Sequence, residues 1–245
     1  MIYNDITNKN GAIQKCEDWL YGGDYGAISG NSIQLLKFTN LINSGLDKTI
    51  SLIYQADARW QNDDPNYTDI PESTTNLSDG VKSYGLEKSQ LIIDGFEVLL
   101  ADGTWRRLKP IDYADIKEKN IALNEYKKTP GIPEEYDLLG TQVSLFPSPS
   151  VNTVTLINGL KIVYRRESSY FLSGDTTKEM GIPRTFHDVP CLFACLEYAS
   201  MNSMEQKMVD ISNELNRRKL ELTKHFSLRN RDEKRRLAVK QESNK

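Results

Sequence analysis

The chain has 245 residues, of which 38% are hydrophobic and 27% are charged, and its formal net charge is −3. These proportions are ordinary for a soluble globular protein, and the longest apolar runs are too short to span a membrane, so no membrane partner is expected. Three cysteines, Cys16, Cys191 and Cys195, are too few for a disulfide framework and favour synthesis in a reducing, intracellular compartment.

The start of the sequence lacks a basic segment followed by an apolar one, so a cleaved signal is not expected. Charge is unevenly distributed along the chain. Residues 207–245 contain 12 Lys or Arg and 6 Asp or Glu, whereas residues 1–206 contain 19 and 28. A basic segment after an acidic body indicates contact with an acidic partner, protein or nucleic acid, and a solvated helix end is an equal alternative.

A long helix is predicted from about Ser32 to Trp60. Asn31 and its neighbours supply N-cap candidates, and apolar residues recur every three or four positions from Leu35 onward. Gly45 inside this stretch costs about 1 kcal/mol relative to Ala and marks where a kink or break would fall. A shorter helical turn before it is predicted to end at Gly22-Gly23.

The segment 61–80 contains two prolines and many Asp, Ser, Thr and Asn residues, so a long loop is predicted there. The strongest strand pattern follows. Two Asp-Gly pairs, Asp94-Gly95 and Asp102-Gly103, separate runs of β-forming residues, and this arrangement predicts a three-stranded meander that ends at Lys109-Pro110.

Asp112 can cap a helix over about 113–128, which Pro130-Gly131 would stop. A hairpin follows, with Val143 and Leu145 on one face of its first strand. The last element is predicted to be one long helix that starts at Asp188 or Val189 and continues into the basic tail at Arg229.

His187, Cys191 and Cys195 recur at intervals of four residues, which would place three metal-ligand types on one helix face. No fourth ligand accompanies them, and the cysteines lie in an apolar run. Core packing is therefore the favoured interpretation, and neither a metal site nor a cofactor is predicted.

Catalytic motifs are absent from the sequence: it has no G-x-S-x-G, no Walker A and no G-x-G-x-x-G pattern. The adjacent carboxylates Asp63-Asp64 and Glu134-Glu135 do not by themselves form an acid/base pair, which needs two different environments. We therefore expect no enzymatic activity and no catalytic residues.

The basic tail offers groups that suit phosphate or an acidic protein surface. No aromatic residues interleave with them, so stacking on single-stranded nucleic acid is not supported. The candidate contact residues are Arg229, Arg231, Lys234, Arg235, Arg236 and Lys240.

Between Tyr136 and Tyr198 several short motifs follow one another. A strand leads to a Pro-x-Pro turn, a second strand ends in Tyr-Arg-Arg, and Ile-Pro-x-x-Phe-His precedes an apolar helix with Ala194 and Ala199. The motif residues are Pro147, Pro149, Tyr164, Arg165, Pro183, Phe186 and His187. This order resembles the tailed-bacteriophage head-to-tail adaptor (connector, head-completion) proteins.

The resemblance implies an α+β fold: a helical bundle of long helices with an inserted small antiparallel β-sheet and an extended C-terminal helix and tail. It implies an adaptor core at 1–205, with the insertion at about 81–166, and a portal-docking arm at 206–245.

The function implied is non-enzymatic. Such adaptors form rings, commonly dodecamers, below the portal protein. Their partners would be the portal, neighbouring copies, the next tail component and double-stranded DNA that passes without sequence-specific binding. Localisation would be the head–tail junction of the virion, after assembly in the bacterial cytoplasm.

Three other interpretations remain open from the sequence. The chain could be another phage ring, stopper or tail-terminator-like protein, which would share assembly but not portal contact. It could bind DNA through its basic tail, or it could be an enzyme with a site that no motif reveals.

Overall fold

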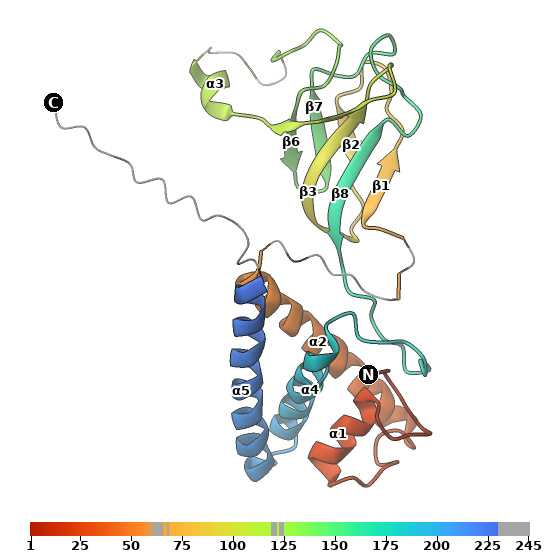
Figure 1. The fold of residues 1–245 in the computed structure, drawn as a ribbon, viewed down its shortest axis with the longest axis vertical. Helices are drawn as coiled ribbons and strands as arrows, with labels where there is room; N and C mark the ends of the chain where they lie inside the picture. The colour runs from red at the N-terminus through yellow and green to blue at the C-terminus, as the bar shows by residue number, and fades with distance from the viewer. Residues whose placement is uncertain (59, 61–65, 68, 119–121, 123–124, 230–245) are drawn as a thin grey trace, which may run out of the picture. The chain divides into compact units, whose positions relative to one another are not determined.

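The structure, a computed structural model, describes residues 1–58, 60, 66–67, 69–118, 122 and 125–229. The chain divides into two compact units, which Figure 1 shows. The helical unit consists of residues 1–67 and 168–245, and the β unit consists of residues 68–167. In sequence, the β unit is therefore inserted between the two halves of the helical unit.

The helical unit contains α1 (Ala12–Tyr21), α2 (Ser32–Ala56), the short 3-10 helix η1 (Arg184–Phe186), α4 (Asp188–Met201) and α5 (Glu205–Arg229). The predicted end of the first helix and the predicted start of the second are confirmed, whereas α2 ends at Ala56 and not at Trp60. Gly22 closes α1 in the left-handed conformation that glycine adopts readily, and the Asn31 side chain accepts hydrogen bonds from the Ile33 and Gln34 amides at the start of α2.

Gly45 does not interrupt α2, so the kink or break considered at this residue is absent. A Cβ atom at this position would lie 2.4 Å from the Pro190 carbonyl oxygen and 3.2 Å from Cβ of Phe193. The glycine therefore allows α2 and α4 to pack at close range, and its cost in helix propensity is offset by that packing.

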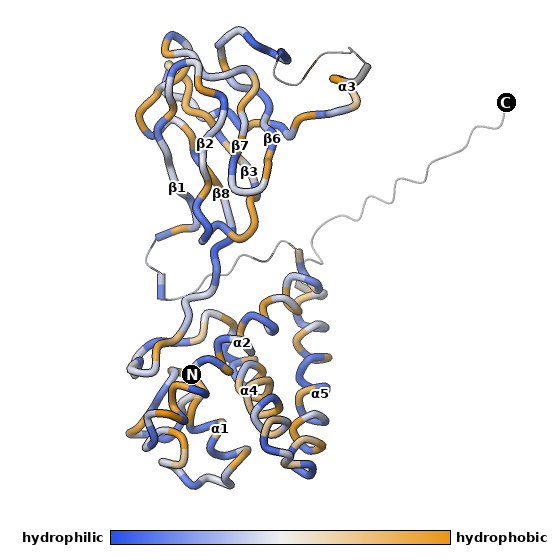
Figure 2. Tube along the Cα trace, turned by 180° about the vertical axis from the view of Figure 1, so that it is seen from behind, coloured by the Kyte–Doolittle hydropathy of each residue, from blue (hydrophilic) through white to orange (hydrophobic). Residues whose placement is uncertain are grey.

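The predicted single C-terminal helix is wrong, because the chain forms α4 and α5 with a turn between them. Ser203 adopts a positive φ of 54°, and the Asn202 side chain donates to the Tyr198 carbonyl oxygen at 2.8 Å. Asn and Ser compete with the helical backbone for hydrogen bonds in this way, which ends α4 and lets α5 pack against it. Figure 2 shows hydrophobic and hydrophilic stretches alternating along α5.

The core of the helical unit includes residues from all of these helices. From α5 it receives Ile211, Leu215, Leu222 and Phe226, each at most 1% exposed. Most of α5 therefore packs as part of the helical unit, and the predicted boundary of a separate arm after residue 205 stays a prediction.

The β unit contains two four-stranded sheets within its described residues. In the first sheet, β1 (Glu72–Thr75), β8 (Leu160–Arg166), β3 (Gln90–Leu99) and β4 (Trp105–Arg107) lie side by side, and all their pairings are antiparallel. In the second, the order is β2 (Ser83–Gly85), β7 (Gln142–Phe146), β6 (Glu135–Leu139) and β5 (Lys109–Pro110), and β5 pairs in parallel.

The two sheets enclose a second hydrophobic core. Phe96 and Val98 of β3, Leu160 of β8, and Val143 and Leu145 of β7 are fully buried in it. The predicted inward face of the strand around Val143 and Leu145 is thus confirmed. Alternate residues of β8 face this core, in keeping with the two-residue period of a strand.

The expected architecture, a helical bundle with a small inserted sheet, is wrong. The chain is α+β, but the described part of its β unit has two sheets and a core of its own. Part of the difference arises in a segment that was expected to be a loop. Glu72–Thr75, within the predicted loop 61–80, is an edge strand on β8, and polar residues are common on edge strands because they discourage further pairing.

The expected meander is correct at only one of its two turns. Asp102-Gly103 forms a turn between β3 and β4, with Gly103 at a φ of 85°. Asp94-Gly95 instead lies inside β3, at a shift in its register with β8. The predicted helix at 113–128 appears as α3 (Tyr113–Glu118), with Asp112 accepting from the Ala114 amide, and residues 119–121 and 123–124 lie outside the described part.

Candidate functional site

The proline turn after β7 ties three segments of the β unit together. The Phe146–Pro147 peptide bond is cis. The Gly131 amide donates to the Ser148 carbonyl oxygen at 2.8 Å, and the Gly80 amide donates to the Pro149 carbonyl oxygen at 2.8 Å. Pro147 and Pro149 thus lie where the chain end of β7 meets two loops that are distant in sequence.

The end of β8 carries two arginines in fixed ion pairs. Arg165 donates from Nε to Asp94 Oδ2 at 3.0 Å and from Nη2 to Asp94 Oδ1 at 2.7 Å, and its side chain is 9% exposed. Such two-point pairing fixes orientation as well as distance. Tyr164 points to the other face and packs in the core of the β unit.

Arg166 makes a comparable contact with Asp69. Its Nη2 donates to the Asp69 carbonyl oxygen at 2.9 Å, and its Nη1 lies 3.2 Å from Asp69 Oδ1. The hydrogen bond from Arg166 holds the pKa of the exposed Asp69 carboxyl below its usual value. Arg166 therefore ties the segment around Asp69, near the start of the β unit, to the end of β8.

The motif around Ile182–His187 forms the entry to α4. Pro183 precedes η1, and Phe186 and His187 are 3% and 1% exposed. His187 Nε2 lies 2.6 Å from the Ile182 carbonyl oxygen, which can only accept, so Nε2 carries the proton. The Met1 ammonium then donates to His187 Nδ1 at 2.7 Å.

Both imidazole nitrogens are therefore engaged, and His187 is a packed residue. Burial lowers its pKa, so the neutral form predominates. Cys191 donates to the His187 carbonyl oxygen, and Cys16 approaches the Cys191 carbonyl oxygen. Contact with the Cys16 thiol, together with burial, raises the pKa of Cys191 well above its usual value. No group of three or more His, Cys, Asp or Glu residues arranged to hold a metal ion occurs in the described part of the chain.

The residues that hold the start of α4 against α5 were not predicted from the sequence. Arg218 of α5 donates from Nε to Asp188 Oδ2 at 2.6 Å and from Nη2 to Asp188 Oδ1 at 2.7 Å, and it also donates to the Thr185 carbonyl oxygen. The bond to Asp188 raises the pKa of Arg218 further above its usual value. We call Arg218, Asp188 and the Thr185 carbonyl the entry clamp.

Aromatic contacts complete this packing. The ring of Phe186 meets His225 edge-on at 5.3 Å and lies 6.3 Å from Phe226. No local sequence pattern predicts these aromatic pairs or the entry clamp, because the partners are about 30 to 40 residues apart in sequence. The sequence pattern did contain the Phe-His dipeptide. In the structure Phe186 packs on α5, and His187 contacts the Ile182 carbonyl oxygen and the Met1 ammonium.

A polar depression on the β unit has a volume of about 530 Å³ and is lined by Arg106, Lys127, Lys128 and Glu134 among others. Its cations are paired with carboxylates: Arg106 and Lys127 with Glu134, and Lys128 with Glu125. The depression therefore has little uncompensated charge, and the nearby pair Glu134-Glu135 is engaged in salt bridges.

Arg229 is the last residue of α5, and its side chain, like Arg231, Lys234, Arg235, Arg236 and Lys240, lies outside the described residues. Among the described residues, no helix has the length and apolar character needed to cross a membrane.

Comparisons with known proteins give no family for this chain: neither the family models nor the curated proteins yield a match. The functional conclusion therefore depends on the motif residues and on where the structure places them.

Proposed function

We propose that this chain is a structural head-to-tail adaptor of a tailed bacteriophage. In this proposal, copies of the chain form a ring below the portal, extend the DNA channel and join the capsid to the tail. The motif order between Tyr136 and Tyr198 suggests this function.

The main support for the proposal is that the motif residues hold separate chain segments together. Pro147 and Pro149 connect three chain segments, Arg165 is fixed on Asp94, and Phe186 and His187 pack the entry of α4. Side chains that are buried or ion-paired in this way set the geometry of the chain and are poorly placed to act on a substrate. That supports an assembly component over an enzyme.

The proposed partners are the portal protein, neighbouring copies, the next tail component and the DNA that passes through the channel. The basic residues after α5 would contact acidic groups of the portal, and a segment of this composition can become ordered when it binds. The proposed location is the head–tail junction of the virion, after assembly in the cytoplasm of the bacterial host.

A photo-crosslinking amino acid at the end of α5 tests this location. Leu228 is 39% exposed, and the control position Ile157, in the β unit, is more accessible at 73% exposed. Particles assembled with the Leu228 probe are irradiated, and the adducts are identified by mass spectrometry. We expect a portal adduct from position 228 and none from position 157.

Imaging of the same particles with a tagged chain provides the second measurement. A ring between portal and tail agrees with the proposal. Presence of the chain in particles at the far end of the neck or tail, without a portal adduct, would instead indicate a stopper or tail-terminator role. Absence from purified particles would rule out a virion component altogether.

A further inference from the structure

An apolar groove is lined by Phe193, Leu196 and Met201 of α4 and by Met208 of α5. The groove has a volume of about 490 Å³, and Met201 is 57% exposed. Methionine side chains adapt their shape to an inserted apolar group, so this surface suits a protruding aliphatic side chain.

The charges around the groove are not balanced. Lys48 on one rim pairs with Glu197 at 2.8 Å. Lys219 of α5 lies 4.8 Å from the centre of the Phe193 ring and makes no ion pair with any described residue. A ligand that fills this groove would therefore gain from a carboxylate placed beside its apolar group.

A tight turn elsewhere on the same unit presents this combination. Leu172 is 70% exposed, and it directly follows Phe171, whose ring is buried and stacks on Tyr3 at 4.7 Å. Asn43 of α2 holds the Phe171 backbone through two hydrogen bonds, from Nδ2 to the carbonyl oxygen at 3.0 Å and from the Phe171 amide to Oδ1 at 2.9 Å.

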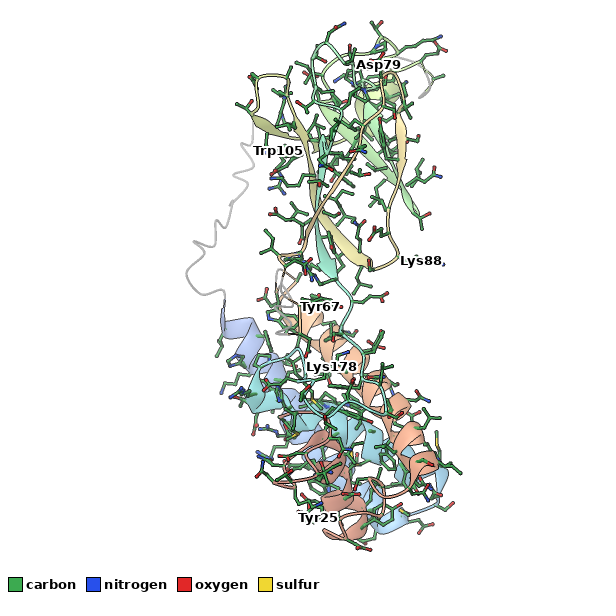
Figure 3. The ribbon with its side chains drawn as sticks, turned by 90° about the vertical axis from the view of Figure 1, so that its right-hand side faces the viewer. Tyr25, Tyr67, Asp79, Lys88, Trp105 and Lys178 are labelled. Carbon is green, nitrogen blue, oxygen red and sulfur yellow. The ribbon has the colours of Figure 1, made fainter. Side chains whose placement is uncertain are left out.

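The turn is closed by Asp175. Its Oδ2 accepts from the Leu172 amide at 2.8 Å, and its own amide donates to the Leu172 carbonyl oxygen at 3.0 Å. Asp175 makes no ion pair with any described residue. Lys178, labelled in Figure 3, donates to the Tyr170 carbonyl oxygen and so holds the chain just before the turn. The exposed Leu172 is thus held in place before any partner arrives, which lowers the entropic cost of binding.

We propose that Leu172 of one copy inserts into the α4 groove of a second copy, with Asp175 beside Lys219 of that copy. This inference rests on the proposed function, in which copies form a ring. The turn is fixed on α2 through Asn43, and its segment loops out on the side of the helical unit away from α5 (Figures 1 and 2), whereas the groove is lined in part by Met208 of α5.

Each copy therefore offers one turn and one groove on different surfaces. Contacts of this kind are head-to-tail, and they continue from copy to copy until the rotation closes a ring. The chemistry matches at both points. Asp175 and Lys219, which form no ion pair with any described residue, would meet each other, and the exposed Leu172 would meet a groove lined in part by methionines.

Three variants with matched controls test the contact by sedimentation velocity over a range of concentrations. Leu172→Ser removes the protruding side chain, and Ser200→Arg fills the groove from an exposed position on α4. Ile157→Ser, at a residue of similar exposure in the β unit, controls for lost apolar surface. Lys219→Glu is compared with Lys224→Glu, an exposed residue of the same helix.

We expect the wild type and both controls to self-associate equally. Leu172→Ser, Ser200→Arg and Lys219→Glu should each weaken association by about tenfold or more, as expected for loss of one buried leucine or one desolvated contact. Circular dichroism establishes that the variants are folded.

Mixing provides the decisive measurement. Leu172→Ser keeps its groove and Ser200→Arg keeps its turn, so a mixture of the two should form heterodimers and nothing larger. A mixture that stays monomeric, variants that associate as the wild type does, or a wild type that never associates would each overturn the contact. The crosslink from Leu228 to the portal is independent of these results, so failure here is distinguishable from failure of the adaptor proposal.

Discussion

Gly45 shows how a single residue can look like a defect in the sequence and be required by the packing. Inside α2 it lowers helix propensity, yet a side chain at this position would press on the backbone of α4 at Pro190. The backbone there cannot rotate away as a flexible side chain would. A sequence pattern reports the local cost of glycine, and only the tertiary structure reports the compensating contact.

Replacing Gly45 with alanine should therefore destabilise the protein. Alanine gains about 1 kcal/mol in helix propensity, but overpacking against a fixed backbone costs about 1–3 kcal/mol, and a Cβ–oxygen distance of 2.4 Å places this site at the costly end. We expect a net loss of about 1–2 kcal/mol by urea denaturation. Asn40→Ala, at an exposed position of the same helix, is the control and should be neutral or stabilising. A stabilised Gly45→Ala variant would contradict the close approach.

His187 gives the protein a defined response to acid. Burial lowers its pKa, and burial also lowers the pKa of the Met1 amine that donates to it. Below about pH 6.5 the unfolded chain binds a proton at this imidazole and the folded chain does not. Stability is therefore present above this pH and is lost as the pH falls, by at most about 1.4 kcal/mol per pH unit for this group. The charges of Glu179 and Arg184 have opposite effects on the pKa of His187: the carboxylate raises it and the guanidinium lowers it.

The test compares the slope of unfolding free energy between pH 7.5 and 5.5. His187→Gln, which keeps a donor and an acceptor, should show a shallower slope than the wild type even if it is less stable throughout. Equal slopes for the wild type and His187→Gln would show that the imidazole is not held neutral.

At the scale of elements, the entry clamp decides how α5 packs on the start of α4. Arg218 is 16% exposed and Asp188 is 21% exposed, so the pair is largely shielded from water. By contrast Arg217, the neighbouring residue, is 58% exposed and pairs with Glu214 and Glu221 on its own helix. Two adjacent arginines thus have different roles, and sequence alone assigns them the same one.

Substitution with methionine separates these roles. Arg218→Met leaves the Asp188 carboxylate and the Thr185 carbonyl without their donor, and we expect a loss of about 2–3 kcal/mol by chemical denaturation. Arg217→Met, which breaks only exposed pairs, should cost about 0.5 kcal/mol or less. Equal losses would mean that the clamp does not hold α5.

Elements with a strong local pattern were predictable from the sequence. The Asn31 cap, the long α2, the Asp102-Gly103 turn and the inward pair Val143 and Leu145 all follow from spacing and turn chemistry. The edge strand Glu72–Thr75 was missed because its four polar residues carry no apolar alternation.

The turn predicted at Asp94-Gly95 was wrong for a different reason. The pair fits a tight turn, but here the Asp94 carboxylate binds Arg165 and Arg107 packs over Gly95, where a Cβ would lie 3.0 Å from its Nη2. The entry clamp depends on contacts between residues that are distant in sequence. At Asn202 and Ser203 a turn competes with a continuous helix, and tertiary packing of α5 on α4 favours the turn. The apolar stripe alone therefore predicted one helix.

At the scale of the whole molecule, we propose that residues up to Phe226 form the folded core and that the tail contacts the portal. Deleting residues 230–245 should leave the thermal unfolding midpoint within about 2 °C of the wild type, because every buried side chain named in the helical core precedes the deletion. Binding to the portal in a co-sedimentation assay should fall strongly. Unchanged co-sedimentation would remove the tail from the proposal.

A full-length chain with Arg231, Lys234, Arg235, Arg236 and Lys240 changed to glutamine controls for length. Its portal binding should be weakened most at low salt, since screening by ions already reduces an exposed charge contact at high salt. An affinity that does not vary with salt in the wild type would instead favour an apolar contact.

The insertion of the β unit between α2 and α4 also bears on the order in which the chain matures during translation. Residues 68–167 are contiguous, so this unit can fold once they have left the ribosome. The helical core, in contrast, joins Tyr3 near one end to Phe226 near the other. After the β unit is complete, roughly sixty more residues must be made, about 3–12 s at bacterial and eukaryotic elongation rates. During that interval the apolar faces of α1 and α2 have no partner, so nascent chains are most exposed to chaperones while α4 and α5 are being synthesised.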